Sequence, residues 1–154
     1  MGACIENLKK KNLFESLKLS LSEKPYLGIC LGLQVLFSLS EESIDSEGMN
    51  IFSGKVERFT ENENFKIPHM GWNQVVFKKK HFVNKNIPNS SNFYFVHSYA
   101  SKELKKDNIL AETTHGELFN SAVIQDNIIG VQFHPEKSGE QGLKFLENFI
   151  NWKI

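Results

Sequence analysis

Apolar side chains predict a helix at each end of this chain and short strands between them. From the start to about Leu21, apolar residues recur at helical spacing. Near the other end, Ser138 is followed three residues later by Gln141, a capping box that favours the start of a second helix. The positions expected to form the buried stripe of that helix are Leu143, Leu146, Phe149 and Ile150.

Between these helices, after Gly48, the pattern changes to short apolar runs separated by Asn, Gly and Pro. Such runs are typical of β-strands. The expected strands cover residues 55–59, 74–77, 93–96, 109–114, 121–125 and 128–133. Because the sequence shows no internal repeats and no linker, we predict one α/β domain over residues 1–154, with a largely parallel central sheet.

The segment around Cys30 predicts a strand, a sharp turn and a helix. Residues 26–29 form an apolar run that can be a buried strand. One face of the helix expected after the cysteine would carry Leu33, Leu36, Phe37 and Ser40. Gly28 and Gly32 flank the cysteine symmetrically and would let the strand and the helix approach closely, as in a nucleophile elbow.

A cysteine in such a turn is a candidate nucleophile. The helix N-terminus would lower the pKa of the Cys30 thiol, and the backbone amide of Leu31 would stabilise an oxyanion. The other interpretation of this segment alone is a buried cysteine that two glycines flank by chance, since cysteine is often buried. Cys4 has no such surroundings, and we expect it to be a small packed side chain.

Residues 131–136, near the C-terminus, supply a candidate base for this cysteine. His134 and Glu136 lie two positions apart, so on a strand both side chains point to the same side. The carboxylate could orient the imidazole, which could accept the proton of a thiol nucleophile. Taken alone, the two residues also fit an exposed polar strand end. Together with Cys30 they predict a Cys-His-Glu catalytic triad.

Four segments resemble known motifs in the same order and at comparable spacing, so that the resemblance covers residues 2–152. Segments 25–34 and 130–138 resemble the class I, triad-type glutamine amidotransferases, which hydrolyse glutamine to release ammonia. Segments 66–73 and 93–99 resemble one branch of that family, the glutaminase subunits of imidazole glycerol phosphate synthase in histidine biosynthesis. The resemblance implies the family's flavodoxin-like α/β fold with a mostly parallel sheet, and the triad Cys30, His134 and Glu136.

The resemblance also implies that four residues outside the triad bind the substrate, L-glutamine: Leu31, Gln34, His97 and Ser98. Gln34 follows Cys30 by one helical turn, which would place its amide on the same side as the thiol, able to donate to and accept from the substrate amide. A glutamine that is simply solvated or buried is the alternative for this position. The family implies no cofactor and no metal.

A protein partner is the next implication of the resemblance, contacted by His69, Met70 and Trp72. It would be a β/α-barrel synthase subunit of the cyclase (HisF-like) type, forming a heterodimer and using ammonia to make imidazole glycerol phosphate and an aminoimidazole carboxamide ribotide. Methionine and tryptophan are enriched at protein interfaces, although each could equally lie in the core. A related alternative is a paralogue that supplies ammonia for amidation of nucleotide-linked sugars in surface polysaccharide.

Composition argues against two classes of partner. The chain carries 18 Lys and Arg and 18 Asp and Glu, so no basic surplus would attract nucleic acid or an anionic membrane. Residues 78–80 are lysines, which we interpret as a solvated loop. No apolar run approaches the ~20 residues that cross a bilayer. Two cysteines, one needed as a thiolate, argue against a disulfide framework and for a reducing cytoplasm.

Ahead of their first corresponding helix, members of this family carry strand–helix units and a glycine-rich loop that the sequence does not contain. That loop supplies a second amide to the oxyanion hole, and loss of one such donor typically costs ~100- to 1,000-fold in turnover. We therefore expect an amidotransferase domain whose N-terminal part is missing, either a fragment or a chain whose true start lies upstream. A catalytically impaired binding subunit is the alternative that remains open.

Overall fold

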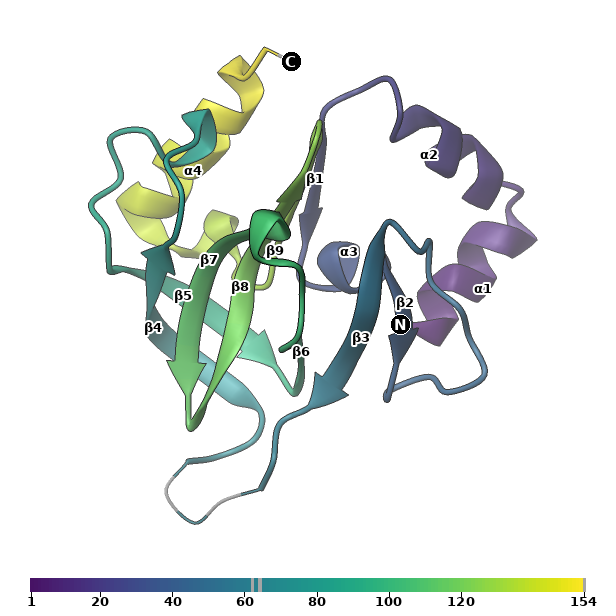
Figure 1. Cartoon of the computed structure of the whole chain (residues 1–154), viewed down its shortest axis with the longest axis horizontal. Coiled ribbons are helices and arrows are strands. Elements are labelled where there is room, and N and C mark those ends of the chain that lie inside the picture. Colours follow the sequence, from purple (N-terminus) through teal and green to yellow (C-terminus); the bar gives the residue numbers. More distant parts are fainter. Residues whose placement is uncertain (62, 64, 154) are drawn as a thin grey trace.

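The computed structural model describes residues 1–61, 63 and 65–153, with strands through the middle of the chain and helices towards both ends (Figure 1). The helices are α1 (Gly2–Lys10), α2 (Phe14–Ser20), α3 (Leu31–Gln34) and α4 (Gly139–Asn151), and short 3₁₀ turns are η1 (Phe82–Asn84), η2 (Lys106–Asn108) and η3 (Pro135–Lys137). The strands are β1 (Tyr26–Ile29), β2 (Phe37–Ser40), β3 (Phe52–Arg58), β4 (His69–Phe77), β5 (Ser91–His97), β6 (Tyr99–Ser101), β7 (Ile109–His115), β8 (Glu117–Gln125) and β9 (Ile128–Val131). Each strand expected from the sequence overlaps one of these.

The larger sheet contains six strands in the order β1-β9-β8-β7-β4-β5. It confirms the α/β class, but it corrects the expected largely parallel sheet, because β1 and β9 pair in parallel whereas the other neighbours are antiparallel. Connection length explains the difference. Gly116 alone separates β7 from β8, and residues 126–127 separate β8 from β9. Such short turns join antiparallel neighbours, since parallel strands need a crossover connection.

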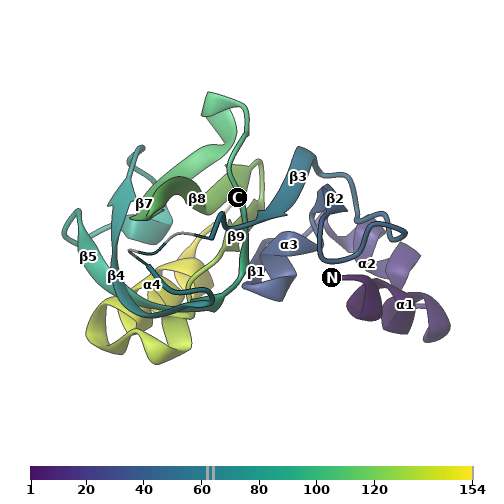
Figure 2. The ribbon, with the colours of Figure 1, turned by 90° about the horizontal axis from the view of Figure 1, so that it is seen from below.

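This sheet curls so that β5, at one end of the strand order, returns towards the segment that follows β9 (Figure 2). The backbone N–H of His134 donates to the carbonyl of Tyr94 in β5 over 2.8 Å. The curl therefore brings together two strands that are not neighbours in the sheet. It does so at the carboxyl end of the parallel pair β1 and β9.

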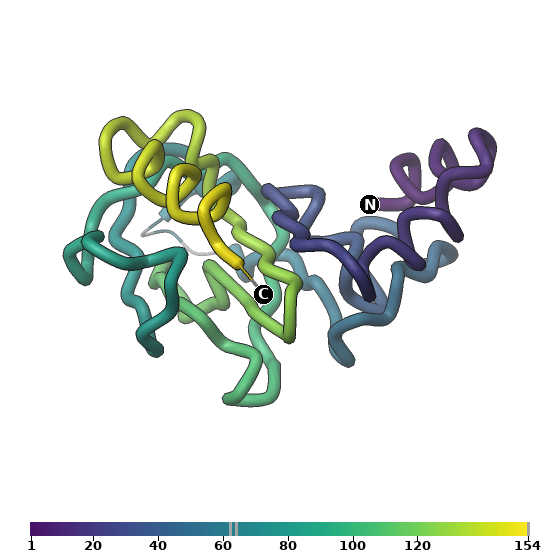
Figure 3. The backbone as a smooth tube through the Cα atoms, turned by 90° about the horizontal axis from the view of Figure 1, so that it is seen from above, coloured from purple at the N-terminus to yellow at the C-terminus, as the bar shows by residue number. Residues whose placement is uncertain are grey.

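The smaller sheet, in the order β2-β3-β6, lies beside the larger one together with the N-terminal helices. Figure 3 shows α1 and α2 at the end of the molecule away from α4. The helix expected to reach Leu21 is divided in two, because Asn12 adopts a left-handed φ of 56° between α1 and α2. A second hydrophobic cluster joins this half to the sheet, and its fully buried members include Ile5, Leu33, Leu36, Phe37, Met49 and Phe52.

The helix expected after Cys30 is a single turn, α3, and its predicted continuation forms strand β2 instead. The prediction of a longer helix is therefore wrong. Residues 35–38 make backbone hydrogen bonds to the segment 48–52, including Met49 N–H to the Val35 carbonyl at 2.8 Å. Phe37 pairs with Phe52 in register, and both rings are buried. Pairing with a later segment thus replaces the intrahelical hydrogen bonds.

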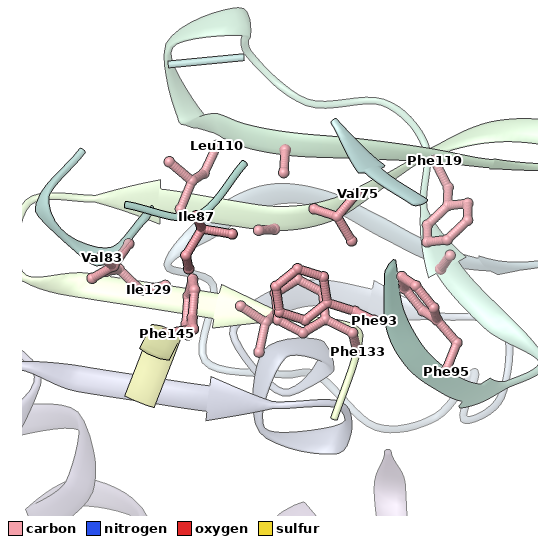
Figure 4. Close-up of a cluster of buried hydrophobic side chains, with 14 of the residues drawn as sticks. Val75, Val83, Ile87, Phe93, Phe95, Leu110, Phe119, Ile129, Phe133 and Phe145 are labelled. Atoms are coloured by element: carbon pink, nitrogen blue, oxygen red, sulfur yellow. The ribbon is translucent and has the colours of Figure 1, made fainter. Parts of the chain in front are cut away.

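Helix α4 packs on the larger sheet through Phe145, which belongs to the main hydrophobic cluster (Figure 4). The rings of Phe93 and Phe133 lie 4.3 Å apart, and those of Phe133 and Phe145 lie 5.6 Å apart. Phe149 packs against the cluster as expected, but two positions predicted for the buried stripe are exposed, Leu143 (63%) and Ile150 (79%). The helix is turned so that buried positions 142 and 145 face the sheet. None of the described helices is long and apolar enough to cross a membrane.

Candidate active site

The turn at Cys30 has the geometry of a nucleophile elbow. β1 ends at Ile29 and α3 begins at Leu31, with Cys30 between them at φ 50° and ψ −102°, a conformation that L-residues rarely adopt. A Cβ added at Gly28 would lie 2.3 Å from the Gly32 carbonyl oxygen, so the close approach of strand and helix requires glycine there. At Gly32 the nearest atom, the Tyr26 hydroxyl oxygen, is 3.6 Å away. Of the two predicted glycines, the first is therefore the sterically required one.

The carboxylate of Glu136 contacts the imidazole of His134, as the sequence predicted. Nδ1 of His134 lies 2.7 Å from Oε1 of Glu136, a distance that fixes the imidazole with its proton on Nδ1. Nε2 is left as the acceptor, and it is buried without a hydrogen-bond partner among the residues that the structure describes. An unpartnered buried nitrogen that can take a proton is the feature expected of a general base.

The parallel pairing of β1 and β9 explains why cysteine and histidine come from distant parts of the chain to one edge. Ile29 pairs with Val131, and the N–H of Cys30 donates to the Val131 carbonyl over 2.7 Å. The residues that follow the two strands, Cys30 and Gln132, are therefore neighbours. His134 follows two positions later, and its N–H donates to the Tyr94 carbonyl of β5, the strand whose Val96 carbonyl oxygen lies 4.0 Å from the Cys30 sulfur. Carboxyl ends of adjacent parallel strands are a common location for reactive groups.

The thiol of Cys30 is half-buried and lies between two polar groups. Its sulfur lies 4.0 Å from the Val96 carbonyl oxygen and 3.6 Å from Nε2 of Gln132. Burial raises the pKa of the Cys30 thiol, and hydrogen bonds from the Leu31 amide and Gln132 act in the opposite direction without cancelling it. The expectation of a lowered pKa is therefore wrong for this structure. Because α3 is only one turn long, the lowering effect of the Leu31 amide is smaller than the raising effect of burial.

Of the residues expected to bind glutamine, Leu31 follows the thiol directly and Gln34 is linked to it through Gln132. Gln34 is buried, and its Nε2 donates to the Tyr99 carbonyl at 3.2 Å and to Oε1 of Gln132 at 3.4 Å. His97 is buried and its Nδ1 lies 2.9 Å from the same Tyr99 carbonyl. Leu31 is 40% exposed at the start of α3, and Ser98 follows β5 directly. Gln34 and His97 thus meet at the Tyr99 carbonyl, and Ser98 is the next residue after His97. Contact of all four residues with substrate stays a prediction.

His69 and His97 belong to a line of buried polar groups beside the site. Nδ1 of His69 lies 3.0 Å from Nε2 of His97, and Nε2 of His69 lies 3.1 Å from Nδ2 of Asn73. Burial lowers the pKa of His97 to about 4 and that of His69 to about 3. Both imidazoles are therefore neutral near pH 7. His97 must donate through Nδ1 to the Tyr99 carbonyl, which can accept but not donate.

The three residues expected to face a partner lie on two faces of β4. Met70 is 62% exposed and Trp72 is 58% exposed, whereas His69 is 3% exposed. Side chains alternate along a strand, so positions 70 and 72 share the outer face while position 69 points inward. The expectation that His69 contacts a partner together with Met70 and Trp72 is therefore corrected, because the His69 side chain is buried inside the protein. Trp72 also contacts Tyr94 edge to face, with ring centroids 6.1 Å apart.

Two residues of the site, Tyr94 and Gln132, were not singled out from the sequence. A third, Ser138, was singled out as a helix cap but has a different role. The hydroxyl of Ser138 donates to the His134 carbonyl at 2.6 Å and accepts the Tyr94 N–H at 2.9 Å, so it does not form the predicted capping box. Gln132 precedes His134 by two positions, and the alternation of a strand end could have placed both on one side. Tyr94 and Ser138 carry no comparable local signal. Cys4 packs against the second hydrophobic cluster, as expected.

Comparison with known families agrees with this geometry. A family model described as glutamine amidotransferase class-I matches residues 6–152. The chain belongs to the class-I glutamine amidotransferase family. The elbow, the imidazole and the carboxylate described above all lie within the matched part of this amidotransferase.

Relatives of this amidotransferase with curated descriptions share close to half of its residues. The imidazole glycerol phosphate synthase subunit HisH of Hydrogenovibrio crunogenus is 43% identical over 152 residues, which cover 97% of this chain and 71% of the relative. The subunit of the same name from Sulfurimonas denitrificans is 45% identical over 157 residues, covering 99% of this chain and 75% of the relative.

Solved structures share the fold of this amidotransferase at lower sequence identity. A crystal structure described as glutamine amidotransferase has a TM-score of 0.65 and 17% identity, with 92% of this chain and 70% of that chain covered. A glutamine amidotransferase from Thermotoga maritima has a TM-score of 0.56 and 17% identity, with 94% of this chain and 56% of that chain covered. At these identities the likeness shows the fold alone.

Proposed function

We propose that this protein is the glutaminase subunit of an imidazole glycerol phosphate synthase, with Cys30 as nucleophile, His134 as general base and Glu136 as the group that orients the base. The observation that carries the proposal is the state of the His134 ring. Its Nδ1 is held by Glu136, and its Nε2 is buried and has no hydrogen-bond partner in the part of the chain that the structure describes. An imidazole fixed in this way can take a proton from a thiol, and Cys30 and His134 both follow the ends of the paired strands β1 and β9.

In the proposed reaction His134 takes the proton of the Cys30 thiol as the sulfur attacks the side-chain carbonyl carbon of glutamine. The raised thiol pKa implies that the resting thiol is protonated, so attack requires this base. The carbonyl oxygen becomes an oxyanion, which the Leu31 amide stabilises. His134 then returns the proton to the leaving nitrogen, so that ammonia departs and a glutamyl thioester remains.

The second half of the reaction uses the same residues. His134 removes a proton from water as the water oxygen attacks the thioester carbonyl. The carbon–sulfur bond breaks, glutamate leaves, and the proton held by His134 returns to the thiolate of Cys30. Whenever His134 holds the transferred proton, Glu136 compensates the positive charge of the imidazolium. Each turnover therefore consumes one glutamine and one water and yields glutamate and ammonia.

Two features support the rest of the assignment. The curated relatives carry the name of the synthase subunit, and Met70 and Trp72 present a flexible apolar and a large aromatic side chain on the outer face of β4. We propose that this face binds the β/α-barrel synthase subunit that receives the ammonia. The thiol nucleophile requires a reducing compartment, and we place the reaction in the cytoplasm.

Glutamate release from glutamine, measured with and without the purified synthase subunit, tests the proposal. Cys30→Ser should abolish glutamine turnover, while ammonium chloride still supports synthesis by the partner. Cys4→Ser is the matched control, because the chain contains 2 cysteines and Cys4 lies in α1; it should retain turnover. Glutamine hydrolysis by folded Cys30→Ser protein, or none by the unmodified chain with its partner, would contradict the proposal.

A further inference from the structure

The side-chain amide of Gln132 occupies a single orientation because of the groups around it. The Tyr99 carbonyl can only accept a hydrogen bond, so Gln34 must present its NH₂ group there, at 3.2 Å. The same NH₂ group lies 3.4 Å from Oε1 of Gln132. The oxygen of Gln132 is thereby assigned, and its NH₂ group faces the sulfur of Cys30 at 3.6 Å.

Burial makes this orientation costly to reverse. Gln132 has no exposed surface, and Gln34 is 6% exposed. Turning the amide of Gln34 would set its oxygen against the Tyr99 carbonyl and leave the Gln132 oxygen without its donor. A buried polar group that loses its hydrogen bond destabilises the fold, because no water replaces the lost partner. The amide of Gln34 therefore maintains the direction in which Gln132 donates.

The sulfur of Cys30 has two polar neighbours of opposite kind. The Val96 carbonyl, at 4.0 Å, can accept the S–H of the neutral thiol but repels a thiolate. Gln132 can donate to the sulfur, and a donor of this kind favours the ionised form. When His134 removes the thiol proton, the contact with Val96 is lost and the contact with Gln132 becomes stronger.

We propose that Gln132 is a positioning residue for the nucleophile, whose amide N–H holds and stabilises the Cys30 thiolate in the direction of attack, and that Gln34 fixes the orientation of that amide. This role deepens the proposed amidotransferase function and rests on it for its catalytic meaning. The stabilisation of the thiolate itself is a property of the unliganded protein and can be measured without glutamine.

Alkylation of Cys30 by iodoacetamide as a function of pH tests the proposal. A Cys4→Ser background leaves Cys30 as the remaining cysteine of the 2 in the sequence. Gln132→Met keeps the approximate shape of the side chain and removes the donor. Loss of a hydrogen bond to a charged group should slow alkylation about tenfold or more below the thiol midpoint and move the midpoint to higher pH. Gln141→Met, in the first turn of α4, is the matched control and should leave both unchanged.

Two further measurements separate positioning from loss of structure. Gln132→Glu is nearly isosteric, and its carboxylate cannot donate, so it should raise the alkylation midpoint even if Gln132→Met fails to fold. In the glutaminase assay, folded Gln132→Met should lower kcat more than it raises KM. An unchanged alkylation profile in both folded variants overturns the proposal. Because alkylation needs no turnover, that outcome is independent of whether the protein hydrolyses glutamine.

Discussion

The backbone N–H of His134 donates to the carbonyl of Tyr94 over 2.8 Å, joining the segment after β9 to strand β5 at the base of the proposed triad. The hydroxyl of Ser138 contacts both residues, donating to the His134 carbonyl and accepting the Tyr94 N–H. The N–H of His134 is thus held by Tyr94, and its carbonyl by the Ser138 hydroxyl and by the Lys137 N–H at 3.0 Å. The imidazole is therefore positioned by the closure of the sheet and not by its own segment alone.

Ser138→Ala should destabilise the protein and reduce turnover. Ser138 is 2% exposed, and its removal leaves the Tyr94 N–H without its partner, at a cost of about 1–3 kcal/mol, while the His134 carbonyl keeps the Lys137 N–H. Urea unfolding and glutamate release provide the two measurements. Ser20→Ala is the control, since Ser20 bonds only its own exposed helix and should change stability by less than ~0.5 kcal/mol. Equal effects of the two substitutions would contradict this role of Ser138.

The two glycines of the elbow should respond differently to alanine. Gly28→Ala places a methyl group 2.3 Å from the Gly32 carbonyl oxygen, so the strand and the helix must separate, at a cost of about 1–3 kcal/mol or more. Gly32→Ala meets its nearest atom at 3.6 Å and gains helix propensity, so it should be neutral or slightly stabilising. Thermal unfolding of both variants distinguishes them. Comparable losses would mean that the close approach at Gly28 is not required.

The sequence predicted the parts of the site that depend on neighbours in the chain. Gly28 and Cys30 constrain one turn, and His134 and Glu136 are related by strand alternation, so both units could be expected. Residues 37–40 were misassigned because their strand exists only through pairing with a segment beyond Gly48.

Tertiary contacts decided the other errors. The hydroxyl of Ser138 bonds to His134 and to Tyr94 in β5, contacts that no local capping pattern contains. Starting the expected strand at residue 74 instead of at His69 hid the alternation that separates His69 from Trp72. The thiol pKa was misjudged since burial by β5 and β9 is not visible from the elbow sequence.

Because of His69 and His97, the protein should become less stable as the pH is lowered below neutrality. Both are neutral in the folded protein, with pKa values lowered by burial to about 3 and about 4, whereas an unfolded histidine titrates near 6.5. Below pH 6.5 the unfolded chain binds more protons than the folded one. Each histidine then lowers the free energy of unfolding by up to ~1.4 kcal/mol per pH unit until its folded pKa is reached.

Urea unfolding of the unmodified protein and of His97→Gln at pH 7, 6 and 5 measures this contribution. The variant keeps a polar side chain but cannot titrate, so its stability should depend less steeply on pH. Titrating groups remote from His97 are common to both proteins and cancel in the difference, whereas His69, whose pKa His97 helps to lower, contributes to it. The same slope in both proteins would show that His97 does not titrate as its burial implies.

Trp72→Ala should weaken binding of the synthase subunit without altering the isolated fold. Trp72 is 58% exposed, so its loss removes little of the core. Aromatic residues at interfaces often contribute 2 kcal/mol or more, which corresponds to about 30-fold in Kd. Isothermal titration calorimetry of each variant with the synthase subunit measures Kd. Leu19→Ala, on α2 at the other end of the molecule, is the control for an exposed apolar side chain and should leave Kd unchanged.

The parallel pairing of β1 and β9 also determines when the site comes into existence as the chain folds. Cys30 and Gln132 are in contact although 102 positions separate them in the sequence. Closing so long a loop is entropically costly, and contacts between such distant segments form slowly compared with local ones. A partly folded chain therefore carries the thiol without its base or its donor. Recovery of glutamine hydrolysis after dilution from urea should accordingly follow the docking of β9, and no earlier intermediate should hydrolyse glutamine.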